Sequence, residues 1–97
     1  MQPVKKELLG VDMWFLNDLL HREDGPAVDD VRGNCEWWLH GKRHREDGPA
    51  VENRTDFQWW VHGLLHREDG PAVIRYNAEG DIIGEEYWLN GIKININ

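Results

Sequence analysis

The residues best suited to chemistry are a histidine, a glutamate and an aspartate that occur together three times. The segment His-Arg-Glu-Asp-Gly-Pro-Ala-Val occupies residues 21–28, 44–51 and 66–73. A histidine beside carboxylates could perform acid–base catalysis or help to hold a metal ion. A catalytic site, however, needs one set of different groups in one pocket, whereas three identical copies indicate one structural task repeated. We therefore expect no catalytic residue and no enzymatic activity.

Two histidine pairs also have the spacing of zinc ligands. Three residues separate His40 from His44, and three separate His62 from His66. A glycine follows the first histidine of each pair, which predicts a tight turn between strands rather than a helix face. Asparagine replaces that first histidine in the outer copies, and a turn residue that tolerates positive φ explains both residue types. The expected result is no metal site and no cofactor.

The Asp-Gly-Pro part of each copy predicts a turn that no helix can cross. We expect its glycine to adopt backbone angles closed to other residues, while proline fixes its own φ and aspartate bonds the following amides. The neighbouring arginines and glutamates are predicted to form an ion-pair ladder along one edge, which contributes little per pair. The predicted structural turn residues are Asp24, Gly25, Pro26, Asp47, Gly48, Pro49, Asp69, Gly70 and Pro71.

The repeated segment belongs to a longer unit with a period of 22 or 23 residues. Two large side chains, seven and six residues before each motif histidine, begin a short strand that ends in the turn pair. A fourth, truncated copy starts at Tyr87-Trp88 and is not followed by the motif. Two strands per unit predict an all-β fold, a single antiparallel meander of about eight strands built from three and a half hairpin repeats. The predicted strands are 12–16, 27–31, 35–40, 50–54, 57–62, 72–76, 82–89 and 92–96.

The repeats predict one domain over residues 11–97, preceded by an N-terminal cap over residues 1–10. A longer hairpin is expected to turn at 77–80. In the cap, Val4, Leu8 and Leu9 follow Pro3 at helix-like spacing, which predicts a short N-terminal helix. The repeat units extend over about 11–31, 35–54, 57–76 and 82–96.

Strand parity divides the aromatic side chains into two sets, because alternate residues of a strand point to opposite faces. Trp37 shares a face with Leu39, and this wholly apolar face is expected to form the core. Trp38 lies between Glu36 and His40 on the other face, which we predict to be a half-exposed aromatic stripe that binds a partner. The alternative is that these indoles only pack over the valines of the intervening strands. The predicted partner-binding residues are Phe15, Trp38, Trp60, Trp88, Glu36, His40, His62 and Glu86.

The segments EWWLHGKRHREDGPAVE at 36–52 and QWWVHGLLHREDGPAVI at 58–74 resemble the MORN (membrane occupation and recognition nexus) repeats, and more closely the MORN-like repeat proteins of the bacterial and phage type. The resemblance covers residues 13–94. It implies an extended β-hairpin array that docks proteins or, in some members, lipids. Arg-Glu-Asp stands here where the family has small glycines, which argues against membrane binding.

Charge and composition limit the partners and the compartment. Six tryptophans and 40% apolar residues indicate a folded chain, and 18 acidic against 11 basic residues produce a net charge of -7. Such a chain repels phosphate backbones and anionic lipids, so we expect no direct nucleic-acid or membrane binding. A lone cysteine, Cys35, and the lack of a signal peptide or long apolar run predict a cytoplasmic protein, in the host cytoplasm if phage-encoded.

These observations lead to two hypotheses about function. The first is a non-enzymatic protein–protein interaction module. Its sharper version is a phage-type anti-defence inhibitor, in which the acidic protein occupies the basic nucleic-acid groove of a defence effector such as a CRISPR enzyme. The alternative is a structural, self-assembling β-repeat protein, because exposed edge strands can pair with a second copy to form a homodimer.

Overall fold

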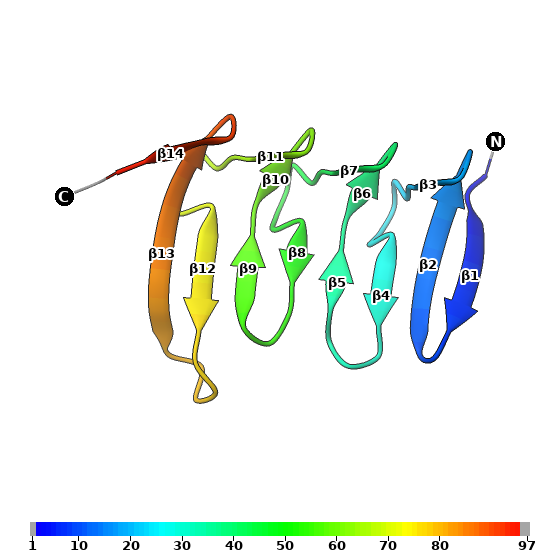
Figure 1. Cartoon of the computed structure of the whole chain (residues 1–97), viewed down its shortest axis with the longest axis horizontal. Coiled ribbons are helices and arrows are strands. Elements are labelled where there is room, and N and C mark those ends of the chain that lie inside the picture. The colour runs from blue at the N-terminus through cyan, green and yellow to red at the C-terminus, as the bar shows by residue number, and fades with distance from the viewer. Residues whose placement is uncertain (1, 96–97) are drawn as a thin grey trace.

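The computed structural model describes residues 2–95 and contains only strands, turns and loops over that range (Figure 1). The all-β fold predicted from the repeats is thereby confirmed. None of these residues belongs to a helix that could cross a membrane. The strands are β1 (Val4–Leu8), β2 (Val11–Leu16), β3 (Leu19–Leu20), β4 (Val28–Asp30), β5 (Cys35–Glu36), β6 (Trp38–Leu39), β7 (Lys42–Arg43), β8 (Val51–Glu52), β9 (Asp56–Gln58), β10 (Trp60–Val61), β11 (Leu64–Leu65), β12 (Val73–Tyr76), β13 (Ile82–Leu89) and β14 (Ile92–Ile94).

The main sheet is an antiparallel meander, as predicted. Its strands lie in the order β1-β2-β4-β5-β8-β9-β12-β13-β14, which follows the sequence, and β3 pairs with β2 beside this path. The predicted strand 82–89 has its observed bounds, and the predicted strands 12–16, 27–31 and 72–76 match within one residue. The longer hairpin also turns where expected, since the Gly80 N–H donates to the Asn77 carbonyl at 3.1 Å. The last predicted strand ends at 94, and its residue 96 lies outside the described residues.

The predicted N-terminal helix is wrong, because Val4–Leu8 forms the edge strand β1, which pairs with β2. The two strands are joined by a turn in which Leu9 has φ 52° and Gly10 has φ 83°. The apolar residues that suggested a helix face are exposed, with 62% of Leu8 and 82% of Leu9 accessible. Their spacing therefore did not mark a buried surface, and pairing with β2 outweighed the weak local helix signal.

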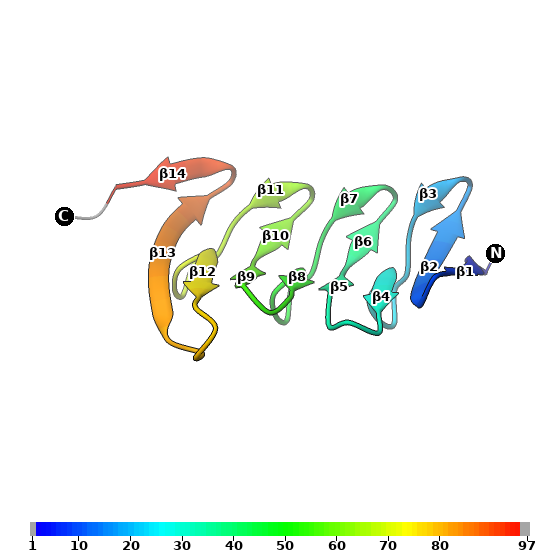
Figure 2. The ribbon, with the colours of Figure 1, turned by 60° about the horizontal axis from the view of Figure 1, so that its bottom comes forward.

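The aromatic strands of the second and third units are each divided between two sheets, because ladder pairing is interrupted at Trp37 and at Trp59. Beyond the interruption, β6 pairs with β7, and β10 pairs with β11, in separate two-stranded sheets. In the first and fourth units, β2 and β13 continue without interruption. The short strands β3, β7 and β11 were not predicted, since their residues had been assigned to the polar connection. The hairpins β2–β3, β6–β7, β10–β11 and β13–β14 follow one another along the array (Figure 2).

The turns of these hairpins confirm the backbone conformation predicted from their sequence. His40, His62 and Asn90 have φ of 49°, 51° and 50°, and the glycine after each has φ of 79° or 80°. Two consecutive residues with positive φ match the twist of the flanking strands, which is why Asn-Gly-type pairs suit such turns. The histidine and asparagine at this place are therefore turn residues.

Neighbouring repeats are joined by backbone hydrogen bonds that recur at every junction. Between the second and third units, the Arg45 N–H donates to the Trp60 carbonyl at 3.0 Å, and the Gly63 N–H donates to the Arg43 carbonyl at 2.8 Å. The corresponding bonds at the flanking junctions are Arg22 to Trp38, Gly41 to Leu20, Arg67 to Trp88 and Gly91 to Leu65. Each repeat is thus bonded to its neighbour by its main chain.

The core is a row of small side chains. Ala50 is fully buried, and Val51, the first residue of β8, is 4% exposed. Val51 pairs with Glu36 and with Gln58, and residues paired across antiparallel strands lie on the same face of the sheet. The prediction that the Trp37 face forms the core is therefore incomplete, because this buried valine lies on the face of Glu36. The buried apolar residues are Ala27, Ala50, Val51, Ala72 and Val73.

Candidate functional site

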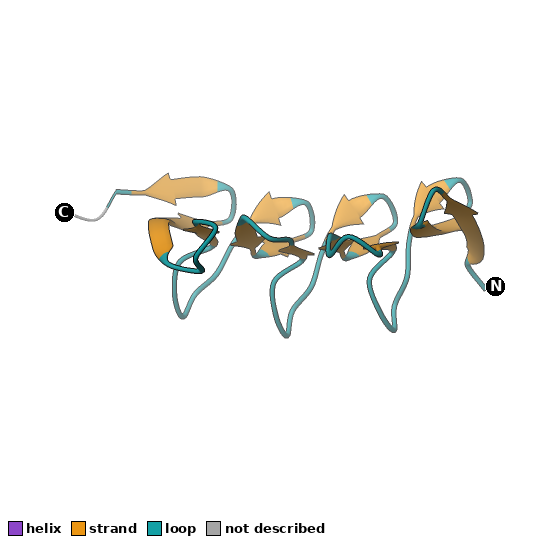
Figure 3. Cartoon of the chain, turned by 90° about the horizontal axis from the view of Figure 1, so that it is seen from below, coloured by secondary structure: helices purple, strands orange, loops and turns teal. Residues whose placement is uncertain are grey.

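The three HREDGP loops, which project from one side of the strands (Figure 3), have the same internal structure. In the second loop, the Arg45 Nε donates to Asp47 Oδ1 at 2.9 Å, and its Nη1 donates to the Pro49 carbonyl at 3.1 Å. The guanidinium lies 4.1 Å from the centre of the Trp37 ring, eight residues earlier. Arg22 and Arg67 make the same contacts in their loops. Each arginine is thus bound within its own repeat.

The glycine of each loop has a different role from the one predicted. Gly48 does not have positive φ, so it is not required by backbone conformation. A Cβ placed there would lie 2.9 Å from the Cζ of Arg45, which is too close for a real contact. Gly25 and Gly70 face Arg22 and Arg67 in the same way. A side chain at Gly48 would therefore displace the guanidinium from its place over the Trp37 ring.

The predicted ladder of arginines and glutamates is also wrong. Arg45 pairs with Asp47, two residues on, and reaches Glu52 on β8, while the adjacent Glu46 is 82% exposed. The hydrogen bond and the charge of Arg45 lower the pKa of Asp47. In each loop the glutamate and aspartate side chains are therefore largely exposed to solvent, while the arginine side chain packs against its own repeat. The exposed carboxylates are Glu23, Asp24, Glu46, Asp47, Glu68 and Asp69.

The motif histidines connect one repeat to the next. The backbone N–H of His62 donates to Nδ1 of the buried His44 at 2.9 Å, and the two rings are 4.5 Å apart. The same bond joins His40 to His21 and Asn90 to His66. The histidines that meet therefore come from adjacent repeats and are not the pairs spaced three apart. Residues 2–95 contain no group of three potential metal ligands.

The predicted aromatic stripe is present, and its indoles are fixed by hydrogen bonds along their own strands. Trp38 Nε1 donates to Glu36, and Trp60 Nε1 donates to Gln58, both at 2.9 Å. Trp88 makes the same bond with Glu86, and Arg75 and this bond lower the pKa of that glutamate. The stripe residues Phe15, Trp38, Trp60 and Trp88 are all half-buried.

Side chains of the second hairpin strands lie between the stripe aromatics. The register pairs Phe15 with Leu20, Trp38 with Arg43 and Trp60 with Leu65. Along the stripe, an aromatic residue therefore alternates with a long side chain from the second hairpin strand in these three units. These residues were not predicted, because β3, β7 and β11 were taken as loop. Val51 pairs with Glu36 and with Gln58, which places one of the buried valines on the stripe face and supports part of the packing alternative.

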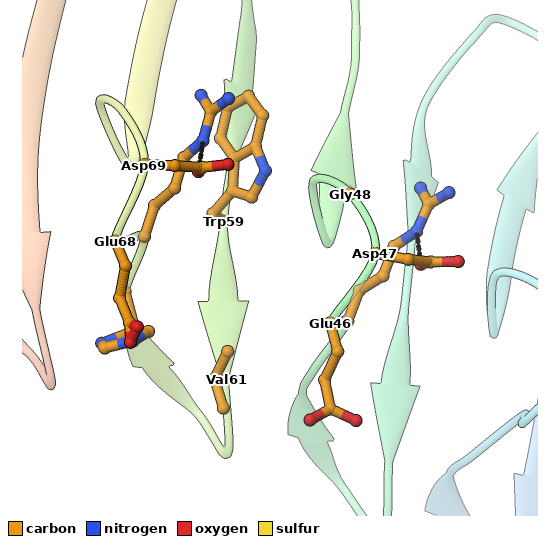
Figure 4. Close-up of a pocket in the computed structure, with 10 residues that line it drawn as sticks. Glu46, Asp47, Gly48, Trp59, Val61, Glu68 and Asp69 are labelled. Carbon is orange, nitrogen blue, oxygen red and sulfur yellow. Dashed lines mark hydrogen bonds and ion pairs between the residues drawn. The ribbon is translucent and has the colours of Figure 1, made fainter.

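Grooves lie between successive repeats on both sides of the array. One of about 700 Å³ separates the second and third loops and is lined by Glu46, Asp47, Trp59, Val61 and Glu68, among others (Figure 4). A smaller one of about 370 Å³ occupies the equivalent place between the first and second loops. On the stripe side, a groove of about 410 Å³ is bordered by Trp38, Arg43, Trp60 and His62. Of the predicted partner-binding residues, the structure thus brings together Trp38, Trp60 and His62.

Cys35 lies outside these grooves. Its thiol is 3.6 Å from the Asp29 carboxylate, and burial together with this negative charge raises the thiol pKa. A raised pKa keeps the thiol protonated, and the protonated form is a poor nucleophile. No family model, curated protein or solved structure matches the chain significantly.

Proposed function

We propose that this protein is a non-enzymatic module that docks a partner protein on its aromatic stripe. The observation that carries the proposal is the groove between Trp38 and Trp60. Both indole nitrogens already have acceptors on their own strands, so the rings are held in place before any partner binds. Preorganised aromatic side chains lose little entropy on binding and are frequent hot spots of interfaces. The resemblance of segments 36–52 and 58–74 to MORN-like repeats supports the same proposal.

The finer version of the proposal concerns the other side of the array. There the loop arginines are bound internally, and six carboxylates remain exposed on three equivalent loops. A regular row of carboxylates is complementary to a basic groove made for nucleic acid. The partner that we propose for this face is therefore a basic nucleic-acid-handling defence enzyme, such as a CRISPR effector, inhibited by a phage-encoded protein in the host cytoplasm.

The test is an affinity capture that compares two matched variants with the parent protein. Proteins retained by the parent and lost with Trp60→Ala depend on the stripe. Those lost with Glu46→Gln and Glu68→Gln depend on the loop face. Arg54→Ala, at an exposed position outside both surfaces, is the control and is expected to retain every partner. The proposal is wrong if neither variant loses a partner that the control retains.

A second candidate function is self-association through sheet edges. The edge strand β1 is exposed along its length, and Ile82 and Ile83 of β13 are 55% and 65% exposed. Unprotected apolar strands can pair with another copy, although Lys5 and Lys6 make β1 less suitable. Light scattering over a wide concentration range separates the two candidates, because self-association requires a mass above that of the 11.4 kDa monomer.

A further inference from the structure

The junction between the second and third units has a basic side chain between its two stripe aromatics. Leu20 and Leu65 occupy the equivalent places on β3 and β11, at the flanking junctions, and the same place on β7 holds Arg43. The fourth equivalent residue, Lys93 on β14, pairs with Trp88 beyond the last junction. The Arg43 guanidinium lies 5.1 Å from the centre of the Trp38 ring and 5.2 Å from that of Trp60. Two indoles from different repeats therefore flank one cation.

Arg43 is bonded less well than the loop arginines. Its Nε is buried without an acceptor and is the only side-chain nitrogen or oxygen of this kind in residues 2–95. The nearest carboxylate, Glu36, is 3.8 Å from Nη2, which is too long for a hydrogen bond. Both oxygens of Glu36 already accept hydrogen bonds, one from Trp38 and one from Asn34. The guanidinium thus has donors to offer and no strong partner within the chain.

The surroundings of Arg43 indicate what a partner would bring. About a third of its side chain is exposed, and it borders the 410 Å³ groove together with Lys42 and His62. This is a local concentration of basic side chains in a protein of net charge -7. A guanidinium presents parallel N–H groups that fit a carboxylate, and the bond is strong where water is partly excluded. The two indoles and Leu64 favour an apolar group beside that carboxylate.

We propose that the groove at Arg43 receives an acidic side chain of the partner protein, flanked by an apolar residue, with the carboxylate on Nη1 and Nη2. This inference rests on the proposed docking function of the stripe and adds the residue type that the stripe selects. Trp38 and Trp60 act by holding the guanidinium plane and by covering the apolar neighbour. At the two flanking junctions, Leu20 and Leu65 offer no charged group, so these junctions do not select a charged side chain of the partner.

The experiment uses two capped tripeptides that differ only in charge, acetyl-Phe-Glu-Phe-amide and acetyl-Phe-Gln-Phe-amide. Binding is followed through the indole N–H signals of the full chain in two-dimensional NMR, each assigned with a Trp→Phe variant. The glutamate peptide is expected to shift Trp38 and Trp60 saturably and to bind about tenfold more tightly than the glutamine peptide, the usual gain of a charge-assisted hydrogen bond. The signals of Trp14 and Trp59, on the loop side, are expected to stay in place.

Arg43→Leu is the matched variant, because leucine is the residue that the chain itself uses at the equivalent position of the two flanking junctions. It is expected to fold and to bind both peptides equally. The inference is overturned if the parent protein binds neither peptide, shows no preference between them, or keeps its preference in Arg43→Leu. It is also overturned if inorganic phosphate displaces the glutamate peptide at an equal or lower concentration, since the site would then be one for phosphate.

Failure of this inference and failure of the docking function have different signatures. If Trp60→Ala loses a captured partner while Arg43→Leu retains it, the stripe docks proteins but not through a carboxylate. If the tripeptides behave as expected and no partner depends on Trp60, the groove binds acidic segments without serving as a docking surface.

Discussion

The loop side and the stripe side of this array are built from the same repeats but differ in how far the copies vary. The three loops are identical in sequence, and each uses its arginine, aspartate and glycine in the same internal contacts. Along the stripe, the residues paired with the aromatics are Leu20, Arg43, Leu65 and Lys93. Residues that are identical in all copies are therefore those that each repeat needs for its own structure. Residues that vary between copies are those whose side chains are free to contact a partner. This difference favours the stripe as the selective surface.

The largest expected effect on stability is that of removing an indole on the loop side. Trp59→Ala removes the ring on which Arg67 stacks, at 3.9 Å, and leaves that guanidinium without its cover. We expect it to lower the free energy of unfolding by about 3 kcal/mol, and Trp60→Ala by about half as much, because Arg43 keeps a second indole, that of Trp38, when Trp60 is removed. Urea denaturation of the two variants measures the difference. Equal losses would show that the two faces contribute alike to stability.

The next largest expected effect on stability concerns the hydrogen bond by which His44 joins its repeat to the following one. His44→Leu leaves the His62 N–H without its acceptor and is expected to lower the free energy of unfolding by about 2 kcal/mol. His44→Asn keeps an oxygen near the place of Nδ1 and should lose much less. Thermal unfolding of both variants is the measurement. If asparagine is as destabilising as leucine, the imidazole acts by packing and not as a hydrogen-bond acceptor.

A smaller effect tests the contact between the loop glycine and arginine. Gly48→Ala introduces a Cβ against the Arg45 guanidinium and is expected to cost about 1 kcal/mol. In an Arg45→Ala background the same substitution should be nearly neutral, because the colliding group is absent. A double-mutant cycle measured in urea reports this coupling. Additive effects of the two substitutions would mean that glycine is needed for another reason.

The smallest effect is a pH dependence set by carboxylates with lowered pKa. Asp47, beside Arg45, and Glu86, beside Arg75, both bind protons less readily in the folded chain. Their contribution to stability is therefore complete above the unfolded-state pKa of about 4 and is lost as pH falls through the folded value. Unfolding midpoints from pH 7 to pH 2 should decline over the acidic part of this range. Asp47→Asn should flatten the decline slightly, and a steeper decline would contradict the assignment.

Much of the fold could be predicted because turn chemistry and repeat period are local properties. The positive φ at His40 and His62 followed from their place before glycine, and β13 was predicted at its observed bounds. The aromatic stripe was also found, since parity places Trp38 and Glu36 on one face. The predicted strands 35–40 and 57–62 are each interrupted, at Trp37 and at Trp59, because a break in ladder pairing leaves no clear sign in an alternating sequence pattern.

The sequence by itself determined an acidic, all-β array with a fixed period and fixed turns, because these depend on composition and on residues close together in the chain. The tertiary structure decided what each polar group does. It set Arg45 on an indole eight residues earlier, joined His44 to the next repeat, and placed Arg43 between tryptophans of two units. The physical reason is that these partners meet only when repeats stack. The stacking brings backbone donors, rings and guanidinium groups to distances that no single repeat specifies.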